Sequence, residues 1–159
     1  MWNHNVLTEQ LKIKYPIIQA GMAGGVTTPE LVAAVSNAGG LGNVGAGYMA
    51  AQDMRETIHA IFQLTDQPFG VNVFTPEHPE TTQEHINQTN KLLAPIIKDL
   101  GITPVHTGIT VGSKLFEEQI DVLLEEDVPA VSFTFGIPPE AVTEKLKAAN
   151  KIFIRSSLK

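Results

Sequence analysis

Short apolar segments alternate with longer amphipathic segments along almost the whole chain. Two of the apolar segments, 69–76 (FGVNVFTP) and 128–136 (VPAVSFTFG), show little of the every-second-residue alternation of a half-exposed strand. A strand with two apolar faces is buried on both sides, which is typical of parallel strands covered by helices. The alternation of such strands with helices therefore predicts an α/β fold with a parallel sheet.

The same patterns assign each segment to a helix or a strand. Segment 27–40 is predicted as a helix because Thr28 suits the N-cap, Pro29 the first helical position and Gly39 the C-terminal stop. Pro95 is expected to kink or split the helical segment 81–101. The predicted strands are 15–21, 41–47, 69–76, 128–136 and 151–154, and the predicted helices are 27–40, 50–65, 81–101, 113–127 and 138–150.

The stretch GGLGNVGAG contains the spacing G-x-G-x-x-G at Gly40, Gly42 and Gly45. In a dinucleotide-binding Rossmann loop these glycines follow a strand and open a helix. Here a helix precedes them and the next helix begins only after Tyr48, so the spacing is not a Rossmann fingerprint. Gly45 and Gly47 end a predicted strand instead. Two interpretations stay open for them: tight packing within the chain, or room for a ligand to approach the backbone.

The composition limits the classes of partner. The 159 residues carry a net charge of −6 and no cysteine, so the chain lacks both the basic surface of a nucleic-acid or membrane binder and any thiolate chemistry. No leader pattern opens the sequence, and no apolar run reaches the roughly 20 residues of a membrane span. We expect a single domain over 1–159, in the cytoplasm, acting on a small molecule rather than on nucleic acid or a membrane.

The histidines do not form a recognisable site. His78 and His85 lie in a glutamate-rich segment without the H-E-x-x-H spacing that places two metal ligands on one helix face. A solvated polar connection is the favoured interpretation, so no metal ligand is predicted. His106 is not assigned a role because no partner can be named for it, and no catalytic residue is predicted.

Several predicted strand ends, in order, carry a family resemblance. The segments YPIIQAGMAGG, GGLGNVGAG, PFGVNVF and VSFTFGIPP resemble the nitronate monooxygenases, formerly called 2-nitropropane dioxygenases. The resemblance extends from about Trp2 to Asn150. It implies an FMN-dependent enzyme of the TIM-barrel type that carries out oxidative denitrification of alkyl nitronates. Flavin-dependent enoyl-acyl-carrier-protein reductases share the PIIQ and GGLG patterns and are the alternative.

The resemblance also implies which residues contact the cofactor. Ala20, Gly21 and Met22 follow the first predicted strand, in a segment that resembles a flavin-contacting backbone. Asn72 matches the family's FMN-contacting asparagine on the third predicted strand. For Asn72 the alternative is a buried amide satisfied by the backbone, and for Met22 it is core packing. One of Ser132 and Thr134 could point into the barrel interior, where its hydroxyl would meet a ligand; core packing with a local hydrogen bond is the favoured interpretation.

The chain departs from the family pattern in its length and its end. It supplies about the first four βα units and a strand stub, whereas a TIM barrel needs at least about 200 residues. The family's later histidine and phosphate-binding loops are not found, and segment 151–159 is predicted to be an aberrant or truncated tail. A third interpretation is therefore a non-catalytic fragment, either a pseudogene product or a half-barrel that self-associates through an exposed sheet edge. Because the late loops are missing, we expect weak or no FMN binding by this chain alone.

Overall fold

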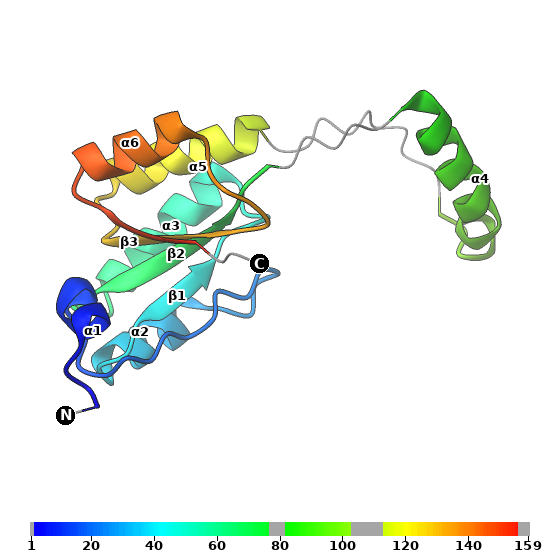
Figure 1. Ribbon diagram of the computed structural model, residues 1–159. Coiled ribbons are helices and arrows are strands. Elements are labelled where there is room, and N and C mark those ends of the chain that lie inside the picture. Colours follow the sequence, from blue (N-terminus) through cyan, green and yellow to red (C-terminus); the bar gives the residue numbers. More distant parts are fainter. Residues whose placement is uncertain (1, 77–81, 103–112, 156–159) are drawn as a thin grey trace. The chain divides into compact units, whose positions relative to one another are not determined.

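Four parallel strands form one sheet in the order β1-β2-β3-β4. The strands are β1 Gly42–Gly45, β2 Phe69–Phe74, β3 Ala130–Thr134 and β4 Ile152–Arg155. The structure is a computed structural model, which describes residues 2–76, 82–102 and 113–155 (Figure 1). The sheet confirms the predicted α/β class with parallel strands, and the predicted strands at 41–47, 69–76, 128–136 and 151–154 are all formed.

The register of the strands separates the two faces of the sheet. Val44 lies beside Val71, and Val71 lies beside Val131. All three are fully buried and belong to the main apolar core. Because side chains alternate along a strand, the residues between them point to the opposite face. There the matched positions are Gly45 with Asn72 and Asn72 with Ser132.

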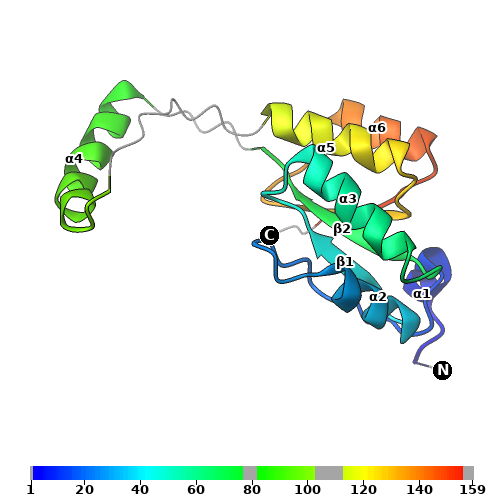
Figure 2. The ribbon, with the colours of Figure 1, turned by 180° about the vertical axis from the view of Figure 1, so that it is seen from behind.

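Four helices contribute to the main core on the valine-rich face. They are α2 Pro29–Asn37, α3 Ala51–Phe62, α5 Ser113–Glu125 and α6 Glu140–Ala148. Figures 1 and 2 show α3, α5 and α6 on the same side of the sheet. Val32 of α2, Ile58 of α3 and Leu146 of α6 are each fully buried there. The four correspond to the helices predicted at 27–40, 50–65, 113–127 and 138–150.

The second face carries a smaller apolar cluster near the amino ends of the strands. Leu11 and Ile13 pack there with Leu41 and Ala130. Leu11 ends α1, Val6–Leu11, a helix that the sequence analysis did not predict. Asn5 caps it, because its Oδ1 accepts from the backbone N–H of Thr8 at 3.1 Å.

The predicted strand at 15–21 is wrong. Only one bridge forms there, between Ile18 and Leu41, and Ile17 and Ile18 are 56% and 38% exposed. The backbone of Gln19 still donates to the Leu41 carbonyl at 2.9 Å. The segment therefore touches the edge of the sheet for one residue without the burial that its apolar sequence indicated.

The chain divides into two units, Met1–Pro76 with Gly112–Lys159, and Glu77–Val111. The second unit contains α4, Gln83–Asp99, whose N-cap Thr82 accepts from the backbone N–H of His85. This helix continues through Pro95, so of the two expected effects, a kink or a split, the split does not occur. Thr81, the first residue of the predicted helix, lies outside the described residues. Within the described ranges, no helix is long and apolar enough to span a bilayer.

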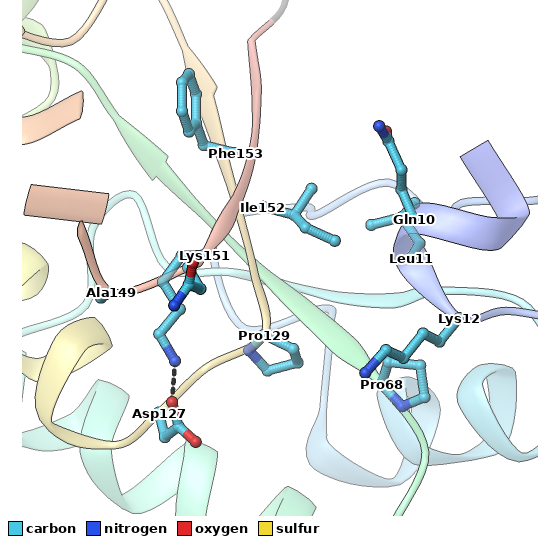
Figure 3. Close-up of a pocket in the computed structure, with 11 residues that line it drawn as sticks. Gln10, Leu11, Lys12, Pro68, Asp127, Pro129, Ala149, Lys151, Ile152 and Phe153 are labelled. Carbon is cyan, nitrogen blue, oxygen red and sulfur yellow. Dashed lines mark hydrogen bonds and ion pairs between the residues drawn. The ribbon is translucent and has the colours of Figure 1, made fainter. Parts of the chain in front are cut away.

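Three helices of the first unit end near one another with residues in the left-handed conformation. Lys12 after α1, Asp127 after α5 and Asn150 after α6 have φ of 55°, 55° and 54°. Such residues commonly stop a helix before the chain turns into the next segment. They line a hollow of about 700 Å³ at the amino ends of β2, β3 and β4 (Figure 3). There the buried ammonium of Lys151 pairs with Asp127.

Gly42 allows α2 to lie directly against β1. A Cβ atom at this position would be 2.1 Å from the carbonyl oxygen of Val32 in α2. The obstacle is helix backbone, which cannot rotate away as a side chain can. The middle glycine of the G-x-G-x-x-G spacing is therefore required by helix–strand packing.

Replacing Gly42 with alanine is expected to lower the free energy of unfolding by about 3 kcal/mol or more, because α2 must move off the sheet. Urea unfolding followed by circular dichroism measures this. Gly24→Ala is the control. Gly24 has φ +93° but no atom within 4 Å of an added Cβ, so that variant carries only backbone strain of about 1–2 kcal/mol. Equal losses in the two variants would contradict the close approach.

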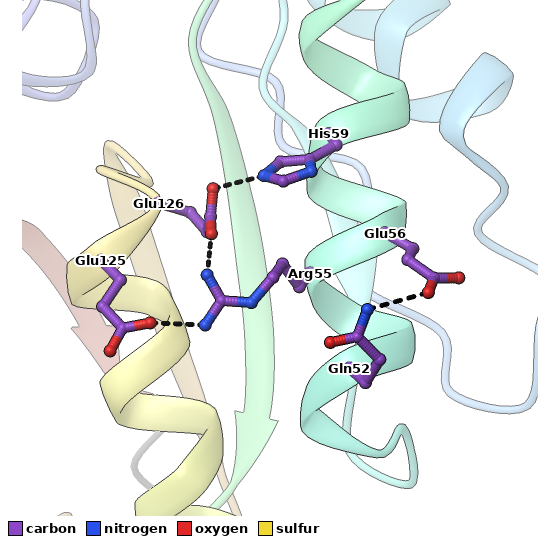
Figure 4. A network of polar contacts seen from close by, with 6 residues as sticks. All are labelled: Gln52, Arg55, Glu56, His59, Glu125 and Glu126. Carbon is purple, nitrogen blue, oxygen red and sulfur yellow. Dashed lines mark hydrogen bonds and ion pairs between the residues drawn. The ribbon is translucent and has the colours of Figure 1, made fainter.

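An ion cluster joins α3 to α5 (Figure 4). Arg55 of α3 pairs with Glu125 and with Glu126 at the end of α5. The second oxygen of Glu126 lies 2.6 Å from Nε2 of His59. The hydrogen bond with His59, followed by the interactions with Arg55, lowers the pKa of Glu126 below its ordinary value.

This lowered pKa gives the fold a defined pH dependence. A carboxylate with a lower pKa in the folded state stabilises the fold above its unfolded pKa of about 4.3, and the stabilisation is lost as the pH falls through the folded value. We expect wild type to be more stable than Glu126→Gln at pH 7 and the difference to shrink below about pH 4. Urea titrations across this range measure it, with Glu117→Gln, at an exposed position of α5, as the control. A difference independent of pH would contradict the assignment.

Candidate functional site

The carboxyl ends of β1, β2 and β3 meet at one edge of the sheet (Figure 1). Two backbone hydrogen bonds continue the pairing past the strands: Ala46 N–H donates to Asn72 at 2.8 Å, and Thr75 N–H donates to Thr134 at 2.9 Å. In α/β barrels this edge carries the ligand, whereas the opposite edge serves stability. The hollow beside Lys151 lies at that opposite edge, so the candidate site is the carboxyl edge.

The segment Ala20–Met22 is held over the end of β1 by two side chains. Gln19 takes the place of a strand partner, because its amide accepts from Asn43 N–H and donates to the Asn43 carbonyl, both at 3.1 Å. Thr27 is buried; its Oγ1 accepts from Gly45 N–H at 2.8 Å and donates to the Met22 carbonyl at 3.2 Å.

Of the predicted cofactor residues, the structure brings Gly21 and Asn72 together. A Cβ on Gly21 would lie 2.7 Å from Cβ of Asn72, so the loop crosses directly beside the asparagine. Asn72 is 7% exposed, whereas Met22 is 41% exposed and Ala20 is exposed. Met22 is therefore not a core residue, and the loop presents backbone and one apolar side chain to the solvent.

Asn72 is bound to β3 through its amide nitrogen. Nδ2 lies 2.9 Å from Oγ of Ser132, 3.0 Å from Oγ1 of Thr134 and 3.3 Å from the Ser132 carbonyl oxygen. The local hydrogen bonds considered for Ser132 and Thr134 are thus present. Both hydroxyls meet the asparagine on the face of the sheet opposite the main core.

Gly45 and Gly47 make room for the chain itself. A Cβ on Gly45 would lie 2.2 Å from the Met22 carbonyl carbon, and one on Gly47 would lie 2.4 Å from the Phe74 ring. Of the two interpretations of these glycines, the structure favours internal packing over ligand approach.

Three aromatic rings gather at the same edge. Phe74 at the end of β2 stands edge-on to Tyr48, with centroids 5.1 Å apart, and to Phe135, with centroids 4.8 Å apart. Tyr48 and Phe135 are 76% and 60% exposed. Phe135 has φ +70°, a conformation unusual for a bulky residue. The edge thus offers exposed aromatic surface beside Asn72 and Thr134.

Gln119 stabilises the carboxyl edge from the face that the helices cover, and the sequence analysis did not identify it. This α5 residue is 1% exposed, and its amide donates to the carbonyls of Ala46 and Met49 at 2.8 and 2.9 Å. It fixes the turn between β1 and α3. The one sequence signal for it is a glutamine on the apolar side of an amphipathic helix, between Phe116 and Ile120.

The described residues hold no group of three histidine, aspartate or glutamate side chains placed to bind a metal ion. His59 belongs to the ion cluster of α3 and α5. His78 and His106 lie outside the described residues, as do residues 156–159 of the predicted aberrant tail.

Comparison with known proteins identifies relatives over nearly the whole chain. The family model described as "Nitronate monooxygenase" matches residues 4–157. Proteins of Staphylococcus aureus strains Newman and JH9, each described as "Probable nitronate monooxygenase", are 48% and 47% identical over 150 residues. These matches cover 94% of this chain and 42% of the relatives. The chain thus spans less than half the length of these curated proteins.

Solved structures match in the same way. The nitroalkane oxidase of Streptomyces ansochromogenes is 37% identical with a TM-score of 0.79, over 96% of this chain and 42% of that one. The M276A mutant of FabK from Thermotoga maritima is 31% identical with a TM-score of 0.69, over 96% of this chain and 39% of that one. Both support the assignment to the TIM-barrel type. The sequence and structural matches agree, and the chain belongs to the nitronate monooxygenase family.

Proposed function

We propose that the carboxyl edge of this sheet is the flavin-facing part of a nitronate monooxygenase, which carries out oxidative denitrification of alkyl nitronates with FMN. The observation that carries the proposal is the position of Asn72, held at this edge beside Gly21 in a chain of this family. Because the chain spans 42% of its curated relatives, the reaction and the substrate are proposed for the protein as a whole.

The chemistry of the edge fits an isoalloxazine ring. Such a ring has hydrogen-bonding atoms along its rim and apolar faces. The amide of Asn72 and the hydroxyl of Thr134 supply polar partners, while Tyr48 and Phe135 supply exposed aromatic surface. The Ala20–Met22 segment adds exposed backbone. Bound FMN would supply the electron transfer, and the protein would supply position and environment.

The residues of the chain have distinct parts in this proposal. Asn72 orients the ligand through a hydrogen bond, and the Ala20–Met22 segment lies beside it. Tyr48, Phe74 and Phe135 exclude water from the edge. No residue of the described ranges is assigned as the base, so proton abstraction is not attributed to this part of the chain.

A second candidate is a flavin-dependent enoyl-acyl-carrier-protein reductase, which rests on the shared PIIQ and GGLG patterns. The nitroalkane oxidase structure matches at higher identity and TM-score than the FabK structures, at 0.79 against 0.69 and 0.66. This difference supports the nitronate candidate. A third candidate, a non-catalytic chain, predicts that no flavin is retained.

The cellular setting is also proposed. A cysteine-free, acidic chain suits the reducing cytoplasm, and its net charge supports a small-molecule ligand over nucleic acid or an anionic membrane.

The first test is FMN binding by the purified chain, measured by quenching of FMN fluorescence. We expect weak, saturable binding with a Kd in the micromolar range or above, and a Kd about tenfold higher for Asn72→Ala, the equivalent of one hydrogen bond. Asn37→Ala is the matched control, because Asn37 also bonds through its amide, to Leu64 and Thr65, but at the amino edge. Absence of saturation up to about 1 mM FMN would refute flavin binding by this chain.

Self-association is expected along the unpaired side of β4, the last strand of the sheet. In the described residues this strand pairs only with β3, and an unpaired strand edge invites a second strand. The N–H of Ile152 donates to Pro129, so by alternation the N–H of Ile154 also faces β3 and that of Arg155 faces the open edge. Sedimentation velocity should show a dimer that dissociates when Arg155→Pro removes this open backbone donor. A monomer at all concentrations would contradict the expectation.

A further inference from the structure

A polar row lies on the second face of the sheet. It consists of Asn43, Asn72, Ser132 and Thr134, with Ser132 at its centre. Ser132 is the register partner of Asn72. Its Oγ accepts hydrogen bonds from two amide nitrogens, Nδ2 of Asn72 at 2.9 Å and Nδ2 of Asn43 at 3.3 Å. A hydroxyl oxygen has two lone pairs, so both are engaged and the hydroxyl hydrogen points away from the two amides. Ser132 Oγ therefore acts toward Asn72 as an acceptor.

The backbone of Ser132 favours the same orientation of the Asn72 amide as the hydroxyl does. Its carbonyl oxygen can only accept, and it lies 3.3 Å from Nδ2. The reversed amide would place Oδ1 of Asn72 against this carbonyl oxygen, and two acceptors cannot form a hydrogen bond. Both amide hydrogens of Asn72 are thus directed to Ser132 and Thr134, and neither is available to a ligand.

The remaining atom is Oδ1 of Asn72. Its protein partner is Thr134 Oγ1 at 3.3 Å, but that hydroxyl already lies 3.0 Å from Nδ2 of the same amide. One hydroxyl cannot align well with both ends of one amide, so the bond to Oδ1 is the weaker of the two. Oδ1 retains acceptor capacity for a ligand.

We propose that Ser132 is a positioning residue, which directs the amide nitrogen of Asn72 into the sheet so that Asn72 meets the ligand as a hydrogen-bond acceptor. The ligand group at this point is then an N–H or O–H donor. Identification of that ligand as a flavin rests on the proposed function, whereas the orientation of Asn72 does not.

The orientation is tested without any ligand. In the wild-type chain, the side-chain NH₂ signal of Asn72, identified by its loss in Asn72→Asp, should exchange slowly with solvent in NMR spectra. Ser132→Ala should speed this exchange about tenfold, the equivalent of one hydrogen bond. Ser132→Thr, which keeps the hydroxyl, should restore it to within about twofold.

Ser36→Ala is the matched control. Ser36 is a buried serine whose hydroxyl, like that of Ser132, accepts from a neighbouring N–H group, here that of Gly42; it also donates to the Pro68 carbonyl, but it lies at the amino edge. It should leave the Asn72 signal unchanged. Equal acceleration in Ser132→Ala and Ser36→Ala would mean general loosening and would overturn the proposal, as would an unchanged signal in a folded Ser132→Ala chain.

FMN titrations separate this inference from the proposed function. If Ser132 acts through Asn72, Ser132→Ala should weaken FMN binding several-fold in the wild-type background and have no further effect in Asn72→Ala. Additive effects would overturn the proposal. If the wild-type chain does not bind FMN, the proposed function fails, while the NMR result still decides the orientation of Asn72.

Discussion

The parallel pairing of β2 with β3 is the constraint on which the rest of the first unit depends. Its register places Val71 beside Val131 on one face and Asn72 beside Ser132 on the other. The first pair is fully buried in the main core, and the second pair belongs to the polar row. Because the side-chain period of a strand is two, a slip of one residue would exchange the faces and expose the core. The burial of the valines thus holds the polar row in place.

Much of the architecture follows from the sequence because it depends on local patterns. The strands at 69–76 and 128–136 are continuous apolar runs, and α3 repeats buried residues at helical spacing in Met54, Ile58 and Ile61. The sequence likewise predicted the capping of α2 by Thr28, whose hydroxyl accepts from Leu31 N–H at 3.3 Å. These signals lie within one element, so neighbouring residues suffice to detect them.

The features that escaped the sequence analysis depend on contacts between distant segments. The apolar run 15–21 resembles a buried strand, but whether it is covered depends on the sheet edge beside it. Gln119 reaches Ala46 across 73 positions, and Ser132 reaches Asn43 across 89. Asn72 was identified through resemblance alone; the direction of its amide required the partner atoms. Helix α1 was missed although Asn5 and Thr8 have the spacing of a reciprocal cap.

The division of the chain at Glu77 and Val111 bears on how this sheet can change over evolution. The packing of α3 with α5, and of β2 with β3 and α5, joins segments that precede the second unit to segments that follow it. The second unit is thus an excursion between two parts that already hold each other. The entropic cost of closing a loop rises only slowly with its length. The inserted segment can therefore become longer or shorter in related proteins while the sheet is kept. Changes in the length and sequence of residues 77–111 can therefore accumulate without rebuilding the strands.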